Sequence, residues 1–385
     1  MRYKLKEIFE LQMGKTPSRH NSSYWNTGDY KWISIADLSN VGKYISETKE
    51  TISESAVIES GIKIIPANTV VMSFKLSIGK TAITAEDMYS NEAIMAFHDK
   101  KIVELLPEYI YYLFKFKDWN VGSNKAVMGK TLNKATLAEM EIEIHTIEEQ
   151  KEIIKVLDQI SNIIANRKQE LIQLDNLIQA RFVEMFGDPI MNPKGWNVVT
   201  IKDIVTEVRY GTSKPAVEGG KYPYLRMNNL TLNGQLDLKN LKYIDIPDEE
   251  IEKCVVRKGD VLFNRTNSID LVGKTAVFNL VEDMVIAGYI IRIRLNEKLL
   301  PEVFSQYMNL KALKDVLRAM AKGAVNQANI NAQELQSIKV YLPDMDIQKQ
   351  FIKIKDQIDK SKFEVQKSLE KTQILFDSLM QEYFG

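Results

Sequence analysis

Short apolar or alternating segments recur along the chain, and each is bounded by polar residues. Examples are KWISIADL (31–38), TVVMSF (69–74), YIIRIRL (289–295) and IKVYL (338–342), with Gly, Asn, Asp and Pro between such segments. This pattern predicts short strands joined by polar loops. Helical patterns with proline near their starts follow at 107–117 and 301–320, where the first helical turn tolerates proline.

Two longer stretches, 146–187 and 344–385, show heptad periodicity. The apolar positions in the first are Ile153, Leu157, Ile160, Ile164, Leu171, Leu174 and Ile178, and those in the second are Phe351, Ile354, Ile358, Val365, Leu369, Phe376 and Leu379. Thr146 and Glu149 have the spacing of a capping box, which predicts that the first helix begins there. A surface helix packed on its own domain would show a similar pattern. Two such helices in one chain favour pairing with each other, as rods of roughly 50 Å at 1.5 Å per residue.

The chain contains an internal repeat. YKWISIADL (30–38) aligns with YPYLRMNNL (222–230), and LNKATLAEMEIEI (132–144) aligns with INAQELQSIKVYL (330–342). Gly14 also aligns with Gly211. Copies near 190 residues are too large for a solenoid unit and indicate a duplicated domain with its connector. We therefore predict mixed α+β domains at 1–145 and 188–343, with helical regions at 146–187 and 344–385.

Composition narrows the class of protein. The chain has 385 residues, no net charge, one cysteine and three histidines, so a disulfide or a cysteine/histidine zinc site is not expected. Its start has no apolar signal-peptide core, and no segment has the ~18 apolar residues of a membrane helix. A cytoplasmic protein without membrane contact is expected. Segment 188–343 has 21 basic against 18 acidic residues, so a general basic coat is absent.

Motifs for catalysis are incomplete. Gly-Lys-Thr occurs at 14–16, 79–81, 129–131 and 273–275, but no copy has the first glycine of a phosphate-binding loop. The copies at 79–81 and 273–275 have matching surroundings, so they mark the repeat. PDEEIEK (247–253) resembles a nuclease cluster but has Ile251 at a position that needs a carboxylate. We expect no catalytic residues, no metal site and no cofactor in this chain.

Polar loops after equivalent predicted strands supply the side chains that bind base edges and phosphates. In the first copy these are Lys15, Thr16, Ser18, Arg19, Asn21, Lys75, Asn124 and Lys125. In the second copy they are Thr212, Ser213, Lys214, Arg226, Asn228, Asn264, Arg265, Thr266, Asn267, Lys322, Asn326 and Gln327. Such loops can be polar without any binding role, but their recurrence in both copies favours matching recognition faces for DNA. Arg265 is the strongest single candidate, because a guanidinium can donate two hydrogen bonds to guanine O6 and N7.

Together the motifs resemble one known family. GKTPSR, YKWISIADL, GDVLFNRTNS, LVGKTAVF, NQANINAQELQSIKVYLP and the EMFGDP…NPKGW junction (184–196) are similar to those of the specificity (S) subunits of type I restriction-modification systems. The resemblance covers essentially the whole chain. It implies two target recognition domains and an antiparallel coiled coil formed by the two helical regions.

The resemblance also implies a function for each part. Each domain would recognise one half of a bipartite, asymmetric site in double-stranded DNA within a prokaryotic cytoplasm. The helices would dock methyltransferase (M) subunits, two of them, and restriction/translocase (R) subunits would join. S-adenosylmethionine, ATP and Mg²⁺ would then belong to those partners. Because recognition loops vary within the family, the DNA-contact residues above rest on their chemistry and on the repeat.

Two alternatives remain open at this point. The chain could be the specificity part of a fused restriction enzyme, which predicts an attached catalytic region. It could instead be a coiled-coil adaptor without DNA contact, which predicts that Arg226 and Arg265 can be removed without effect on binding.

Overall fold

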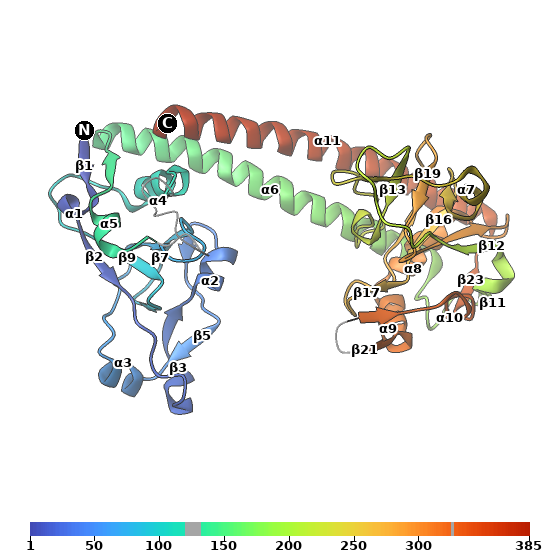
Figure 1. Cartoon of the computed structure of the whole chain (residues 1–385), viewed down its shortest axis with the longest axis horizontal. Helices are drawn as coiled ribbons and strands as arrows, with labels where there is room; N and C mark the ends of the chain where they lie inside the picture. The colour runs from blue at the N-terminus through green and yellow to red at the C-terminus, as the bar shows by residue number, and fades with distance from the viewer. Residues whose placement is uncertain (120–131, 325–326) are drawn as a thin grey trace. The chain divides into compact units, whose positions relative to one another are not determined.

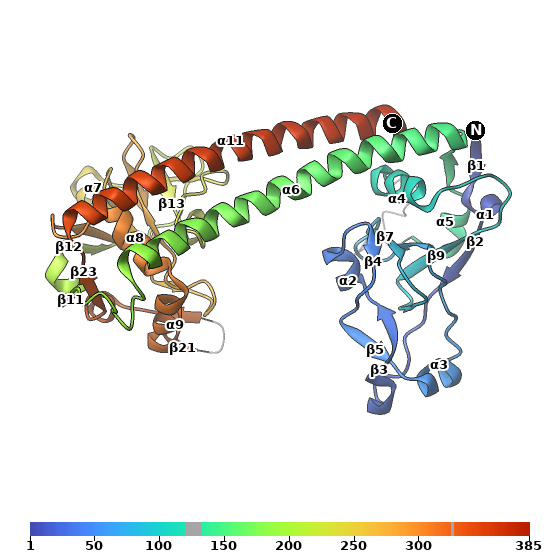
Figure 2. The same ribbon diagram turned by 180° about the vertical axis from the view of Figure 1, so that it is seen from behind.

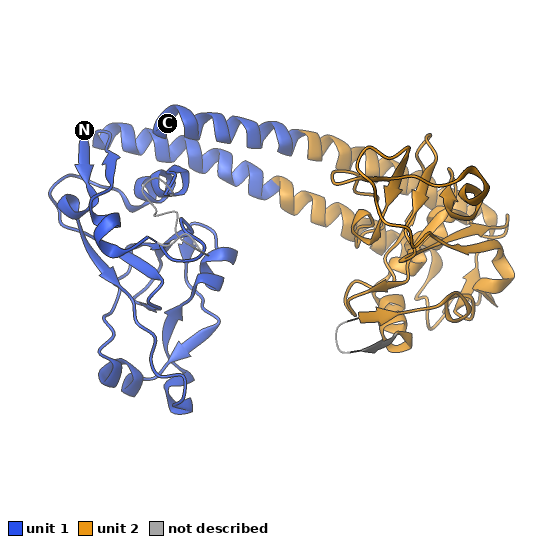
Figure 3. Ribbon diagram, in the orientation of Figure 1, with its two compact units in different colours: residues 1–166, 368–385 blue, residues 167–367 orange. Residues whose placement is uncertain are grey.

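The computed structural model describes the chain except for residues 120–131 and 325–326. It divides into two compact units, which Figure 3 shows in different colours. Unit 1 comprises Met1–Asn166 and Ser368–Gly385, and unit 2 comprises Arg167–Lys367. The two long helices α6 (Ile147–Phe186) and α11 (Met345–Phe384) each contribute to both units.

Unit 1 is built around a five-stranded sheet with the order β2-β9-β6-β7-β4. A three-stranded sheet, β5-β3-β8, and the pair β1-β10 complete it. The strands are β1 (Arg2–Lys4), β2 (Phe9–Met13), β3 (Trp25–Ile33), β4 (Tyr44–Ile45), β5 (Glu50–Ile52), β6 (Val70–Ser73), β7 (Thr81–Thr84), β8 (Tyr89–Ser90), β9 (Ile94–Asp99) and β10 (Glu141–Glu143). The short helices are α1 (Leu5–Ile8), η1 (Ser22–Tyr24), α2 (Ile35–Asn40), α3 (Glu54–Ser60), α4 (Pro107–Phe116) and α5 (Lys134–Ala138).

Unit 2 contains four-stranded sheets with the orders β12-β20-β16-β18 and β14-β13-β19-β15, the three-stranded sheet β17-β22-β21 and the pair β11-β23. The strands are β11 (Asn197–Thr200), β12 (Val205–Tyr210), β13 (Tyr222–Leu225), β14 (Lys242–Ile244), β15 (Val255–Val256), β16 (Val261–Asn264), β17 (Thr266–Asn267), β18 (Thr275–Val277), β19 (Met284–Ile286), β20 (Ile290–Leu295), β21 (Lys322–Ala324), β22 (Gln327–Asn329) and β23 (Lys339–Leu342). The helices are η2 (Ile201–Ile204), η3 (Met227–Asn229), α7 (Asp248–Cys254), α8 (Pro301–Asn309), α9 (Lys311–Met320) and α10 (Ala332–Gln336).

The two units repeat one topology. The order β2-β9-β6-β7 in unit 1 corresponds to β12-β20-β16-β18 in unit 2, and β1-β10 corresponds to β11-β23. In both units a parallel pair of strands, β3-β8 in unit 1 and β13-β19 in unit 2, precedes a short turn. That turn leads into β9 or β20, respectively. The mixed α/β fold and the internal repeat predicted from the sequence are confirmed.

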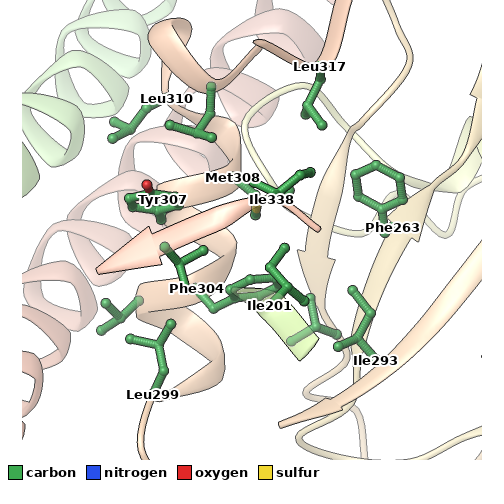
Figure 4. Packing of buried hydrophobic residues seen from close by; sticks show 14 of the residues in the cluster. Ile201, Phe263, Ile293, Leu299, Phe304, Tyr307, Met308, Leu310, Leu317 and Ile338 are labelled. Atoms are coloured by element: carbon green, nitrogen blue, oxygen red, sulfur yellow. The ribbon is translucent and has the colours of Figure 1, made fainter. Parts of the chain in front are cut away.

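The largest hydrophobic core of unit 2 lies between its main sheet, helix α8 and the long helices. Figure 4 shows Phe263 and Ile293 from the sheet facing Phe304 and Met308 of α8. Phe182, Phe186 and Phe351 extend this core to α6 and α11. Each long helix is thus fixed to its globular part by fully buried aromatic rings, which stabilises the joint between domain and helix.

Helices α6 and α11 pair in antiparallel orientation, as Figures 1 and 2 show. In unit 1 the start of α6, with Ile153 and Leu157, shares a core with Met380 near the end of α11. In unit 2 the end of α6 shares a core with the start of α11. The predicted apolar positions are buried or partly buried, and the Thr146–Glu149 capping box forms, with Thr146 N donating to Glu149 Oε2 at 2.8 Å. The coiled-coil prediction is confirmed.

One prediction about helices is wrong. The pattern at 301–320 was expected to be one helix, but α8 ends at Asn309 and α9 begins at Lys311. Leu310 between them has extended backbone angles (φ −64°, ψ 144°). The Asn309 side chain donates to Thr275 O at 2.6 Å, so a contact with strand β18 fixes the chain where the helix ends.

Within the described ranges, no helix is both long enough and apolar enough to cross a bilayer.

Candidate nucleic-acid interface

Each unit has a short turn that joins two strands of different sheets, and we call it the central turn. In unit 1 it is 90–94, between β8 and β9, and in unit 2 it is 286–290, between β19 and β20. Lys15 N donates to Ser90 O at 2.8 Å, and Thr212 N donates to Ile286 O at 2.9 Å. The loop that follows the first strand of the main sheet therefore docks on the central turn in the same way in both units.

A glycine permits this approach. A Cβ atom on Gly14 would lie 2.3 Å from the carbonyl oxygens of Ser90 and Asn91. On Gly211 it would lie 2.2 Å from Ile286 O. Only glycine can occupy either position without displacing the central turn.

The strand beside the turn provides a second equivalence. Phe74 N donates to Ala93 O at 3.0 Å in unit 1, and Arg265 N donates to Tyr289 O at 2.9 Å in unit 2. Phe74 and Arg265 therefore occupy the same backbone position, and TVVMSF (69–74) aligns in pattern with DVLFNR (260–265). By the same register, Glu92 of unit 1 corresponds to Gly288 of unit 2.

In unit 1, predicted contact residues gather around Glu92. The Thr16 hydroxyl donates to the Glu92 carboxylate. This hydrogen bond is the main cause of the lowered pKa of Glu92, with smaller contributions from the charges of Lys75 and Arg19. Glu92 is exposed, so unit 1 presents an ionised carboxylate among basic and hydroxyl side chains.

Arg19 lies in an aromatic and acidic setting. Its guanidinium carbon lies 3.6 Å from the centre of the Trp25 ring, and its two terminal nitrogens donate to Glu50 at 2.5 and 3.0 Å. The bidentate pair lowers the pKa of Glu50 and keeps both groups charged. Arg19 is therefore held in place, with much of its charge compensated.

In unit 2 the guanidinium of Arg265 lies over the Tyr210 ring, with 4.9 Å between its carbon and the ring centre. One terminal nitrogen makes a long 3.4 Å contact with Gly288 O. The Tyr210 hydroxyl accepts a hydrogen bond from Ala332 N at 2.8 Å, which fixes the ring. The described contacts therefore use only some of the N–H groups of the Arg265 guanidinium.

Neighbouring polar residues of unit 2 brace this arrangement. Asn264 is fully buried, and its amide donates to Thr266 O and Tyr289 O, both at 3.1 Å. Thr266 donates to Asn329 at 2.8 Å, and Asn267 donates to Asn264 at 2.8 Å. In this conformation Asn264 and Thr266 face inward, so the structure gives them a supporting position beside Arg265.

The loop after β12 lies on the other side of the central turn. Thr212 accepts from Lys214 N at 3.2 Å, Ser213 is exposed, and Lys214 pairs with Glu250 at 2.8 Å. Tyr224 anchors the loop by donating to Thr212 O and Lys214 O. Thr212 is therefore linked to Arg265 through Gly288, whose N–H donates to Thr212 O and whose carbonyl oxygen contacts the guanidinium.

Asn228 lies in the short helix η3, and Arg226 is the residue directly before it. Arg226 donates to Asn240 O at 3.3 Å, while Asn228 is exposed. Lys274, the lysine of the Gly-Lys-Thr motif at 273–275, is buried and donates to Met227 O at 2.7 Å. This lysine ties two loops of unit 2 together, which is a structural use of the motif.

The remaining candidates lie in varied surroundings. Ser18 O accepts from the Trp25 indole at 3.1 Å, and Asn21 caps η1. Lys322 and Gln327 belong to the β21-β22 hairpin, where Gln327 is exposed. Asn124, Lys125 and Asn326 lie outside the described residues.

Residues of the repeated motifs also form turns and helix caps. Gly79 and Gly273 have φ of +88° and +81°, as expected of tight turns, and Asn133 and Asn331 cap α5 and α10. Sequence reasoning missed Glu92 and Tyr289. Within the described part of the chain, no group of three or more His, Cys, Asp or Glu side chains is placed to bind a metal ion.

Comparison with known proteins gives a consistent result. A family model described as "Type I restriction modification DNA specificity domain" matches residues 1–176 and 193–374. The MjaIX type I restriction enzyme specificity subunit of Methanocaldococcus jannaschii is 32% identical over 250 residues, which cover 59% of this chain and 57% of the relative. The EcoKI specificity subunit of Escherichia coli is 22% identical over 263 residues, covering 64% and 56%. The chain spans about half the length of the curated relatives it matches.

Solved structures share the fold. The crystal structure of a type I restriction-modification S subunit from M. genitalium covers 100% of this chain and 96% of its own, with a TM-score of 0.56 and 14% identity. A structure from work on the complex assembly and conformational transition of a type I R-M system has a TM-score of 0.60 and 16% identity, covering 100% and 97%. The architecture with two domains and long helices is therefore that of known S subunits.

Proposed function

Because this chain belongs to the type I restriction-modification DNA specificity family, we propose that it selects the DNA target of a type I restriction-modification complex. Its two domains recognise the two halves of a bipartite, asymmetric site in double-stranded DNA. The chain performs no chemistry itself, and methylation and cleavage reside in partner subunits.

The repeated frame with unlike side chains is the observation that supports two different half-sites. Both central turns hold their loops with equivalent hydrogen bonds. At the position after the third strand of the main sheet, one unit has the buried ring of Phe74 and the other has Arg265. A shared backbone arrangement with different side chains would let both domains bind DNA in the same way while each recognises different bases.

The interface chemistry suits this task. Arg265 can donate to guanine O6 and N7, while Lys15, Lys75 and Lys214 can contact phosphates and position each domain. A chain without net charge neutralises few phosphates by itself. Its partners would then contribute a large share of the affinity for DNA.

Partner docking is assigned to the long helices. Although their seam is buried, several large apolar side chains on them are exposed, including Ile163, Ile172, Phe363, Ile374 and Leu375. Exposed apolar surface on a helix often marks a protein interface. We assign this surface to two methyltransferase (M) subunits, which bind S-adenosylmethionine, with restriction/translocase (R) subunits supplying ATP- and Mg²⁺-dependent steps. The complex acts on DNA in a prokaryotic cytoplasm.

Deletion of the gene tests this proposal. Single-molecule sequencing of host DNA, before and after deletion, should show loss of one bipartite methylated motif, and a plasmid copy should restore it. If methylation is unchanged by deletion while the methyltransferase partners are active, the specificity role is excluded. An adaptor role would then predict that Arg226→Ala and Arg265→Ala chains assemble with the same partners as the wild type.

A further inference from the structure

The central turns carry opposite hydrogen-bonding chemistry at corresponding places. Unit 1 has the exposed Glu92 carboxylate, which only accepts hydrogen bonds, where unit 2 has Gly288. Unit 2 has Arg265, which only donates, where unit 1 has the buried Phe74. Each unit therefore has one charged group beside its central turn. The group in unit 1 accepts hydrogen bonds, and the group in unit 2 donates them.

We infer that Glu92 and Arg265 each determine one base pair, in different half-sites. Glu92 accepts from the amino group at cytosine N4 or adenine N6, and Arg265 donates to guanine O6 and N7. This inference rests on the proposed function and adds the chemical class of base that each central turn selects.

The surroundings of Glu92 favour a base contact over a phosphate contact. A carboxylate is repelled by phosphates, whereas it can accept from an exposed amino group in the major groove. Thr16 holds the carboxylate from one side, and Lys75 and Arg19 provide positive charge near it. Lys75 can contact a nearby phosphate, which would offset part of the repulsion that Glu92 alone would cause. Thr16 is thus a positioning residue for Glu92.

The surroundings of Arg265 orient its guanidinium group, whose two terminal nitrogens can donate hydrogen bonds side by side. The Tyr210 ring supports the guanidinium plane, and Ala332 N fixes the Tyr210 hydroxyl. Arg265 Nε is buried and has no hydrogen-bond partner within the described part of the chain, so only the terminal nitrogens can reach a ligand. A planar group held in this way loses little entropy when both terminal nitrogens bind one base. Tyr210 is the corresponding positioning residue.

A selection from randomised DNA duplexes tests the inference. The full chain, assembled with its methyltransferase partner subunits, would select bound duplexes for wild type, Glu92→Ala and Arg265→Lys. Glu47→Ala and Arg318→Lys are matched controls, because Glu47 pairs with Lys31 and Arg318 pairs with Asp315. Motifs would be compared position by position, together with overall affinity.

We expect each variant to relax one position by roughly 5- to 100-fold, as for loss of one specific base contact. Glu92→Ala, which removes the acceptor oxygens, should lose a preference for cytosine or adenine in one half-site, and Arg265→Lys should lose a guanine in the other. The controls should keep the full motif. Tyr210→Leu should weaken the same guanine position as Arg265→Lys, whereas a merely structural Tyr210 would lower affinity for all duplexes equally.

Each other outcome has a defined meaning. If wild type selects a motif and both variants keep every position, or lose affinity uniformly, the inference is overturned and the specificity role stands. If both variants alter the same half-site, the assignment to separate units is wrong. If wild type selects no motif, the proposed function fails and this inference fails with it.

Discussion

Glycines at the start of the first loop show how closely two segments of each unit approach. In the Gly14→Ala chain, the added methyl group would meet the carbonyl oxygens of Ser90 and Asn91. We expect destabilisation by about 2 kcal/mol or more, because backbone rather than a flexible side chain must move. Gly42→Ala is the control, since a Cβ there has no neighbour within 4 Å. Urea unfolding of both chains measures the difference, and equal midpoints would show that the loop can shift freely.

A half-buried lysine in unit 2, Lys314, gives a pH-dependent prediction. Burial, with help from the charges of Arg318 and Lys274, lowers the pKa of Lys314 to about 7. The unfolded chain therefore binds more protons than the folded chain between pH 7 and about 10.5, so this lysine makes stability rise with pH in that window. Below pH 7 the folded chain must accommodate a half-buried charge.

Replacement by methionine should remove this contribution. In urea unfolding between pH 6.5 and 9.5, wild type should gain stability relative to Lys314→Met as the pH rises. The variant should have its greatest advantage at the acid end. Parallel curves for the two chains would mean that Lys314 remains charged in the folded state.

At the residue scale, the chemistry of a side chain was easier to predict from the sequence than the residues that it contacts. Arg265 is notable in the sequence because an arginine stands among Asn, Thr and Ser, and the structure places it beside the central turn. Glu92 is an ordinary glutamate in a short turn, and its partner Thr16 lies 76 positions away. Nothing local in the sequence indicates that contact.

At the scale of elements, two glutamines at the start of the long helices perform the same task. Gln150 is fully buried, donates to Glu104 O at 2.9 Å and His145 O at 3.0 Å, and accepts from Leu106 N at 3.0 Å. Gln348 makes the equivalent three hydrogen bonds in unit 2. Each glutamine joins a long helix to the segment that precedes the proline-started helix of its domain.

Loss of the Gln150 side-chain amide should destabilise the contact between helix α6 and its domain. Gln150→Leu keeps the apolar volume but leaves three backbone groups without partners, which should cost roughly 3 kcal/mol. Gln159→Leu on the same helix is the control, because Gln159 is exposed and surface changes usually stay within about 0.5 kcal/mol. Thermal unfolding compares them. Similar melting temperatures for both variants would show that water replaces the lost hydrogen bonds.

Elements with a strong local signal were predictable. Heptad spacing and the Thr146 capping box placed both long helices, because their burial follows a regular period along the sequence. The break between α8 and α9 was missed, since it depends on the Asn309 contact with strand β18 and on no proline or glycine. Tertiary contacts decide such boundaries, and one chain segment does not reveal them.

At the scale of the whole molecule, duplication is the feature that the sequence revealed most directly. Equivalent hydrogen bonds at the central turns confirm that both copies keep one frame. The proposed base contacts lie on surfaces whose side chains differ between the copies, so the repeat by itself does not define the bases. The Phe74 and Arg265 positions illustrate that divergence.

The central claim is that two unlike domains recognise two unlike half-sites. The most direct measurement is the methylated motif that the wild-type gene restores in a deletion strain, determined by single-molecule sequencing. Our account predicts two different specified half-sites separated by a fixed number of unspecified base pairs. A palindromic motif, or one continuous specified sequence, would contradict it.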